Sequence, residues 1–339
     1  MINSDTIPSP VMLSRVADSL YWMGRYLERA KHTARLLNVH FDLMLDQSHD
    51  TAVQYRQYLL ASLQLPTDYD KAADDYSLTR WMALDRENDN SVRACIAAAR
   101  ENARQVREQI STEMWEQINQ IYLFVEQVNI DAMWASTPQE FFQNIKTGVH
   151  LFHGLTDSTL VHGQGWHFIQ IGRFMERSIA TAALIDAFFC PKHHLPQSTL
   201  DDPQIPEHLL WIGLLRSCTA FEAYCKIYTA ELDPRCILEF LALHGEFPHA
   251  INFSVQALRR ALQGIMDATQ SARSERAYRR ASRLHADLQY AQVDEITEGD
   301  LHAYFVGIEQ QCTRIHDAIY QSYIAYPIAA DFGDASFIS

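Results

Sequence analysis

The sequence predicts an all-α protein, a helical bundle, and three observations lead to this fold class. Apolar residues recur at alternating three- and four-residue steps over long stretches, the period of one face of an α-helix. The 339 residues include only 12 glycines and 11 prolines, so few positions interrupt a helix. Strand-like alternation is nowhere sustained. With 47% apolar and 21% charged residues, the composition is that of a globular protein that buries a sizeable core.

The first and longest predicted helix begins at Leu13 and ends in the polar stretch at residues 46–50. At about 1.5 Å per residue it would be roughly 50 Å long, so we expect it to form the spine of the bundle. Its apolar seam is unbroken and consists of Leu13, Val16, Leu20, Met23, Leu27, Ala30, Ala34, Leu37, Phe41 and Met44.

A second copy of this spine is predicted at an offset of 148 residues, the separation of Gly24 and Gly172. Identity extends to the face opposite the seam, which shared amphipathicity does not explain. We therefore predict a tandem duplication, with a first helical repeat at 12–157 and a second at 158–325, packed as one globular unit. The matching residues are Gly24, Arg25, Glu28, Arg29, Thr33, Ala34, Leu36 and Phe41, against Gly172, Arg173, Glu176, Arg177, Thr181, Ala182, Leu184 and Phe189.

Shorter helices are predicted around the two spines. Asn90 or Ser91 would cap the one that begins near residue 91. Residues 190–206 carry four prolines and few apolar residues and are expected to form a long loop, and residues 327–339 a loosely held tail. The other helices are expected at 55–65, 69–84, 91–110, 112–128, 138–156, 207–231, 233–244, 249–269, 272–291 and 297–323.

Charge and composition exclude several classes of function. The formal net charge is −14, from 42 acidic and 28 basic residues, and an acidic surface repels phosphates. We therefore expect no nucleic-acid binding unless arginines gather locally. No run of about 18 apolar residues occurs, so no membrane span is expected. Residues 1–10 lack the apolar segment of a secretory signal, and the six cysteines lack zinc spacing, which together predict reduced thiols in the cytoplasm.

The face opposite the seam of the first spine is the main candidate site. It carries aromatic residues that would be unusual on a solvated face, so we expect it to lie against further helices or a partner. Three interpretations are open: a salt-bridge network that locks the repeats together, a carboxylate and guanidinium cluster that binds a polar ligand or cation, or an interface. The candidates are Tyr21, Trp22, Arg25, Glu28 and Arg29, with Arg173, Glu176 and Arg177 from the second copy.

A second candidate is the row of arginines on the helix predicted at 91–110. They follow one another at spacings of seven, four and three residues. Such a row either docks carboxylates or phosphates bidentately or forms a solvated face with acidic neighbours. The row consists of Arg93, Arg100, Arg104 and Arg107, and the ligand or interface candidates on this helix are Arg100, Glu101, Asn102 and Arg104.

Common catalytic signatures are absent from the sequence. It contains no nucleotide-binding glycine motif, no zinc-protease motif and no nucleophile elbow. A di-metal bundle would need Glu-x-x-His on two helices, and the one match, Glu246 to His249, contains a central proline. Since no regularly spaced carboxylate accompanies His162, His167, His193 or His194, neither a metal ion nor another cofactor is predicted.

The run from Met12 to Leu37 resembles the opening signature of the bacterial alpha-E proteins. Residues 99–104, followed by Trp115 and Asn119, and the Gly-Arg-x-x-Glu-Arg at 172–177 do so as well. The resemblance covers roughly residues 12 to 325. It implies a helical protein encoded beside, or fused to, a circularly permuted ATP-grasp protein and a transglutaminase-like protein.

That resemblance also implies a role in ATP-dependent peptide or amide-bond formation, and it maps the family's acidic residues to Glu28, Glu101 and Glu176. The chain departs from the family at Pro248-His249-Ala250, where Pro-Arg-Ser is usual, so a fixed positive charge and a hydroxyl are lost. The leading hypothesis is an accessory partner of an ATP-grasp amide ligase. The alternative is an enzyme whose Glu/Arg active site lies between the two repeats.

Overall fold

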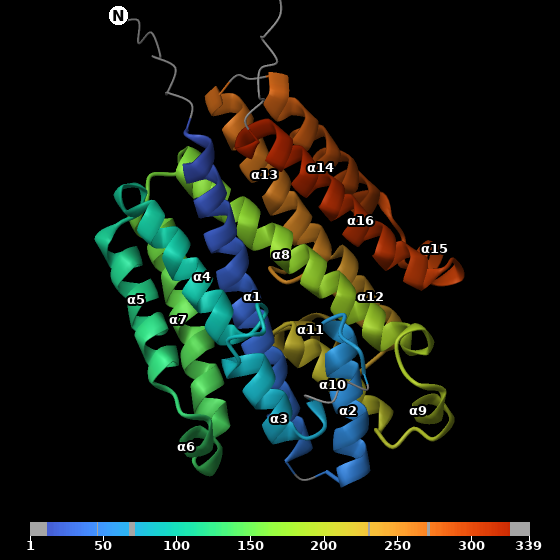
Figure 1. Cartoon of the computed structure of the whole chain (residues 1–339). Coiled ribbons are helices and arrows are strands. Elements are labelled where there is room, and N and C mark those ends of the chain that lie inside the picture. Colours follow the sequence, from blue (N-terminus) through green and yellow to red (C-terminus); the bar gives the residue numbers. More distant parts are fainter. Residues whose placement is uncertain (1–11, 46, 68–71, 230, 270–271, 326–339) are drawn as a thin grey trace, which may run out of the picture.

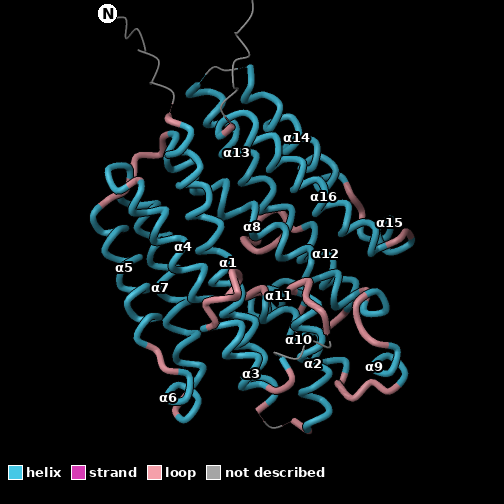
Figure 2. Tube along the Cα trace, viewed as in Figure 1, coloured by secondary structure: helices cyan, strands magenta, loops and turns pink. Residues whose placement is uncertain are grey.

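The computed structural model describes residues 12–45, 47–67, 72–229, 231–269 and 272–325, and within them the chain folds into sixteen α-helices and no strand (Figure 2). The predicted all-α class is confirmed. The polar start at 1–10 and the tail at 327–339 lie outside the described residues.

In the first half the helices are α1 (Ser14–Met44), α2 (His49–Ser62), α3 (Asp75–Thr79), α4 (Val92–Gln105), α5 (Thr112–Gln127), α6 (Ile130–Ala135) and α7 (Pro138–Thr159). In the second half they are α8 (Gln164–Phe189), α9 (Gln197–Asp201), α10 (Glu207–Ser217), α11 (Phe221–Tyr228), α12 (Pro234–Leu243), α13 (Ile251–Thr269), α14 (Ala272–Tyr290), α15 (Val293–Glu298) and α16 (Leu301–Ile319).

The two predicted spines, α1 and α8, lie against each other at the centre of the molecule (Figure 1). On one side of α1 pack α4, α5 and α7; on the side of α8 pack α13, α14 and α16. Because α1 has neighbours on both sides, its seam and its opposite face are both buried, as the aromatic residues on that face predicted. The face with the candidate residues is turned toward α8.

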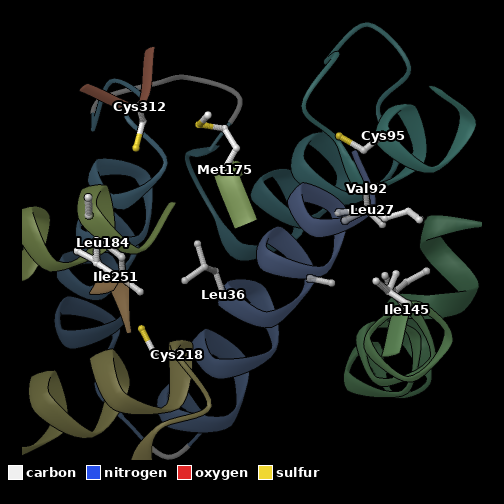
Figure 3. Packing of buried hydrophobic residues seen from close by; sticks show 14 of the residues in the cluster. Leu27, Leu36, Val92, Cys95, Ile145, Met175, Leu184, Cys218, Ile251 and Cys312 are labelled. Carbon is white, nitrogen blue, oxygen red and sulfur yellow. The ribbon is translucent and has the colours of Figure 1, made fainter. Parts of the chain in front are cut away.

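One hydrophobic core runs through both halves of the chain. In the first half Leu27 of α1, Val92 of α4 and Ile145 of α7 belong to it (Figure 3). In the second half Leu184 of α8 and Ile251 of α13 continue it. All five are fully or almost fully excluded from water, so each contributes about the 1.5–3 kcal/mol expected of a buried aliphatic side chain.

Local signals explain where several helices begin. Ser91 caps α4, as predicted, by accepting a hydrogen bond at 3.1 Å from the backbone N–H of Ala94. Asp300 caps α16 in the same way. A new helix therefore begins after Asp300, inside the single helix that was predicted at 297–323. The helix predicted at 207–231 is also divided, because Thr219 adopts a left-handed φ of 54° between α10 and α11. The loop expected at 190–206 contains the short helix α9.

None of the described helices combines the length and apolar character needed to cross a bilayer. All six cysteines are free thiols.

Candidate functional site

The two spines meet at Gly24 and Gly172, the glycines that match between the two predicted copies. A Cβ on Gly24 would lie 2.4 Å from the carbonyl oxygen of Ile169, and one on Gly172 would lie 2.0 Å from that of Tyr21. Both distances are far shorter than real carbon contacts, and the opposing atoms are backbone. Glycine is therefore required at both positions, and the close approach brings the neighbouring Arg and Glu side chains of one helix onto the other.

Glu176 of α8 is held by two arginines of α1. Arg25 donates from Nε to Oε2 at 2.7 Å, and Arg29 donates from Nε to Oε1 at 2.6 Å. Arg29 also donates to the side-chain oxygen of Asn90 at 2.8 Å. Burial would raise the pKa of Glu176, but the charges and hydrogen bonds of the two arginines outweigh it and lower the pKa. We call these residues, with Tyr21 and Trp22, the Glu176 cluster.

Tyr21 and Trp22 complete the Glu176 cluster from the same helix. The guanidinium carbon of Arg25 lies 4.8 Å from the centre of the Trp22 ring, a cation–π distance. Tyr21 is fully buried, and its hydroxyl lies 2.8 Å from Nδ1 of His316 on α16. The aromatic residues are thus structural supports for Arg25, and His316 is a contributor that no sequence pattern indicated.

Glu28 forms the reciprocal pair, in which the carboxylate comes from α1 and the arginine, Arg177, comes from α8. Arg177 donates from Nε to Oε1 at 2.8 Å, and Lys31 donates to Oε2 at 2.7 Å. His153 of α7 lies 3.6 Å from the same carboxylate. Burial would raise the pKa of Glu28, but the charges of Arg177 and Lys31 dominate and hold the pKa well below its ordinary value.

The Glu28 cluster, which we define as Glu28, Lys31, Arg35, His153, Arg173, Arg177 and His249, carries more positive than negative charge. Burial lowers the pKa of Lys31 to about 7, with Glu28 opposing the shift and Arg177 adding to it. Burial and the nearby charge of Arg177 lower the pKa of Arg173 to about 10, and its buried Nε has no hydrogen-bond partner among the described residues.

The predicted departure from the family lies in this cluster. Arg177 donates to the carbonyl oxygen of Pro248 at 2.9 Å, and His249 borders the small cavity beside Glu28. Burial is the main cause that holds the pKa of His249 well below its usual value, so the imidazole is neutral at pH 7. At this position the chain therefore places a neutral ring where the family resemblance expects a fixed positive charge.

The two clusters differ in access to solvent. The cavity beside Glu28 has a volume of about 10 Å³, the space of roughly one water molecule. Glu176 instead borders a pocket of about 240 Å³, whose wall also includes Arg25, Arg29 and Asn90. The side chain of Glu176 is 9% exposed and that of its partner Arg29 is 25% exposed, whereas that of Glu28 is 3% exposed. Glu28 is thus sealed in a salt-bridge network, and Glu176 is reachable from one side.

A pH dependence of stability follows from His32, which borders both cavities. Burial lowers its pKa from 6.5 to about 4, only partly opposed by the charge of Glu28. Below pH 6.5 the unfolded chain binds a proton here that the folded protein does not bind. The free energy of unfolding therefore falls progressively as the pH is lowered from 6.5 to about 4, and His32 causes no further loss below that pH. In His32→Asn the free energy of unfolding should fall less on acidification than in the parent, by up to about 3 kcal/mol.

Urea unfolding at pH 7 and pH 4.5 measures this effect. The control is His49→Asn, because His49 has an 89% exposed side chain and lies at the start of α2. The free energy of unfolding of the control should fall with pH as steeply as that of the parent. A slope for His32→Asn that equals the parent's would contradict the assignment.

The arginine row predicted on α4 joins α4 to α5 and does not reach the carboxylates of the spines. Arg100 donates to Asn119 at 2.6 Å, and its guanidinium carbon lies 4.5 Å from the centre of the Tyr122 ring. Arg104 and Glu101 form an exposed i,i+3 ion pair, and Asn102 donates to the carbonyl oxygen of Ala98. Glu101 and Arg104 therefore fit the solvated interpretation, whereas Arg100 packs against α5, which neither interpretation predicted.

Two groups of residues were missed by sequence reasoning. Asp186, His194 and His302 come together, although His302 lies 116 residues after Asp186. No regularly spaced carboxylate was predicted to accompany His194, and its partner is Asp186, eight residues earlier. In addition, arginines of α14 and α16 gather around a depression of about 580 Å³. The close spacing of Arg279, Arg280 and Arg283 on α14 was the available signal for the second group. Nothing local indicated the first.

The chemistry that the clusters allow is electrostatic. A general acid or base needs a pKa near the working pH and a free oxygen. Both carboxylates instead have lowered pKa values, and both of their oxygens accept hydrogen bonds from cations. They are suited to join α1 to α8, and the excess cations are suited to attract an anion.

Comparison with known proteins relates the chain to one family. The family model called Alpha-E, described as a predicted alpha-helical domain with a conserved ER motif, matches residues 12–324. Glu28-Arg29 and Glu176-Arg177 are Glu-Arg pairs of that kind. No solved structure matches the chain.

Among curated proteins, the uncharacterized protein Mb2597 of Mycobacterium bovis and the uncharacterized proteins MT2643 and Rv2567 of Mycobacterium tuberculosis are similar to it. Each is 24% identical over 344 residues, which cover 92% of this chain. The chain spans only 37% of the length of these relatives. Because the family model matches the chain over nearly the whole length of the chain, the chain belongs to the Alpha-E family.

Proposed function

We propose that the chain is a non-catalytic helical component of an ATP-grasp-dependent system that forms peptide or amide bonds. The observation that carries this proposal is the state of the two motif carboxylates. Glu28 and Glu176 each accept hydrogen bonds from cations on both oxygens, so the Glu-Arg motif works as a joint between helices. The relatives support a modular role, since in them the matched region is part of a much longer chain.

We further infer that the joint connects two duplicated repeats. The support is reciprocal: Arg29 of α1 pairs with Glu176, and the matching Arg177 of α8 pairs with Glu28. The matched glycines also face each other's helix. Such a joint makes a rigid platform, because breaking either pair would leave a buried charge without its partner.

The platform offers one surface suited to an acidic partner. Arg279, Arg280 and Arg283 of α14 and Arg314 of α16 line the depression of about 580 Å³. This concentration of arginine occurs in a chain whose net charge is −14, so it is the place where an acidic protein surface would find complementary charge. Nucleic-acid binding was not expected unless arginines gather locally, and here they do. The test therefore includes an oligonucleotide as a second possible ligand.

We expect the chain to co-elute with a circularly permuted ATP-grasp protein of the kind that the family resemblance implies, when both are mixed at micromolar concentrations. The double charge reversal Arg283→Glu/Arg314→Glu should weaken the complex at least about tenfold, because it places like charges against the acidic partner. Arg104→Glu is the matched control: it is an exposed arginine on α4, 62% exposed, and its reversal should leave the complex unchanged.

No complex at these concentrations would refute the proposed partnership. A complex that survives the double reversal would place the contact elsewhere on the molecule. Binding of a short single- or double-stranded oligonucleotide, lost in the double variant, would show that the surface serves nucleic acid and would contradict the assignment of this face to a protein partner.

An enzyme with its site at the spine crossing is the second candidate. The pocket of about 240 Å³ beside Glu176 favours it, because Arg25, Arg29 and Asn90 present polar groups there to a small ligand. Under this alternative the cations would bind an anionic group of the substrate. Turnover that is lost in a Glu176→Gln protein of nearly unchanged stability would favour this candidate. The Glu28 variant described in the Discussion tests the sealed carboxylate, which does not border this pocket.

A further inference from the structure

We propose that Asp186, His194 and His302 form a binding site for a divalent transition-metal ion of the zinc type. Asp186 lies in the last turn of α8, His194 follows that helix, and His302 lies in the first turn of α16. Two neighbouring segments and one that is 116 residues away thus supply a carboxylate oxygen and two imidazole nitrogens. Figure 1 shows the end of α8 leading into the segment that carries α9, with α16 beginning beside α15.

The potential ligand atoms already converge. Nε2 of His194 lies 2.8 Å from Oδ2 of Asp186, and Nδ1 of His302 lies 2.9 Å from the same oxygen. All three ligand atoms lie within 4.8 Å of one another. Metal–ligand bonds of about 2.0–2.2 Å place neighbouring ligand atoms about 3 Å apart, so an ion could replace the shared protons with small side-chain movements.

The type of ligand selects the class of ion. Two imidazole nitrogens and one carboxylate oxygen suit zinc and the neighbouring first-row ions, whereas calcium and magnesium prefer oxygen ligands throughout. Three protein ligands leave a coordination position for water or another small ligand. Access to that position is available, because the side chains of His194 and His302 are 23% and 28% exposed while that of Asp186 is 5% exposed.

Neighbouring groups fix the orientation of the three side chains. The ring of His193 stacks on that of His302 with centres 4.1 Å apart. Cys190 lies one turn after Asp186, and its backbone N–H donates to the backbone carbonyl oxygen of Asp186 at 2.8 Å. Such outer contacts are what holds ligands in place around a bound metal.

The site is separate from the Glu-Arg joint and does not depend on the proposed function. Asp186 follows Glu176 by ten residues on α8, which is about 15 Å along the helix axis. An ion there would join the end of α8, the segment after it and the start of α16. These are the parts of the second half that the joint itself does not reach.

The test is calorimetric titration of the metal-free full chain with zinc chloride. We expect one equivalent to bind, and Asp186→Asn, His194→Ala and His302→Ala each to weaken binding at least about 100-fold. His49→Ala and His162→Ala remove exposed imidazoles elsewhere and should leave that equivalent unchanged. Zinc should also raise the melting temperature of the parent and of both controls but of none of the three site variants.

Cobalt(II) provides a readout on the parent protein that does not require the variants to fold. Ligation by nitrogen and oxygen gives visible d–d bands without a thiolate charge-transfer band. A strong thiolate band would show that cysteines bind the ion, and it would overturn the assignment. Absence of a saturable equivalent of zinc, or unchanged binding in folded His194→Ala and His302→Ala, would overturn it as well.

Discussion

Replacing Glu28 with glutamine is expected to lower the free energy of unfolding by about 3–5 kcal/mol, the loss typical of a buried ion pair that keeps only one partner. The carboxylate is the counter-charge for Arg177, whose side chain is 3% exposed, and for Lys31, whose side chain is 1% exposed. A neutral amide cannot offset either charge. Lys31, with a pKa already near 7, would then lose its proton more readily, which relieves only part of the cost.

Urea denaturation at pH 7 measures the change. Glu101→Gln is the control, because the family resemblance maps an acidic residue to Glu101 as well, but Glu101 pairs with Arg104 on the helix surface. Its loss should change the free energy of unfolding little, since exposed pairs contribute little. A Glu28→Gln protein as stable as the parent would show that the pair is not needed for the fold.

The same variant tests whether Glu28 serves as a structural partner or as a catalytic group. A joint between helices predicts a large fall in melting temperature together with weaker binding of the partner. An enzyme that uses Glu28 predicts lost turnover with stability nearly intact. Because Glu28 is sealed and its pKa lies well below the ordinary value, we expect the first outcome.

Gly172→Ala is the second large effect that we expect, a destabilisation of at least about 3 kcal/mol, the upper range for overpacking. The added methyl would lie 2.0 Å from the carbonyl oxygen of Tyr21, and a backbone atom cannot turn away as a side chain can. The two spines would have to separate. Separation would in turn stretch the ion pairs of Arg29 with Glu176 and of Arg177 with Glu28.

Gly154→Ala on α7 is the matched control, because a Cβ there would meet nothing within 4 Å. In an open helical position alanine is favoured over glycine by roughly 0.5–1 kcal/mol, so this variant should be slightly more stable than the parent. Thermal and urea unfolding of both variants measure the contrast. Equal stability of the two would mean that the helices can move apart without cost.

By itself the sequence determined the helical class and the long first spine with its ends, since both follow from periodicity and from few interruptions within one segment. It also determined that the face opposite the seam had to be covered, because Tyr21 and Trp22 do not suit a solvated surface. The cap at Ser91 was equally local and was predicted correctly.

Two predicted helices are interrupted at positions that the apolar periodicity does not indicate. The helix predicted at 207–231 breaks at the left-handed Thr219, and the one predicted at 297–323 is divided before the cap at Asp300. Backbone conformation at a single residue decides such breaks. Apolar spacing continues across them and therefore cannot reveal them.

Only the tertiary structure decided which charges meet. From the sequence Arg25 and Glu28 were i,i+3 neighbours, yet each pairs with the opposite spine, because Gly24 and Gly172 let the two backbones approach. The approach of Asp186, His194 and His302 likewise depends on where α8 ends and α16 begins. Pairing across helices depends on distances between segments that are remote in the chain, and no spacing within one segment encodes those distances.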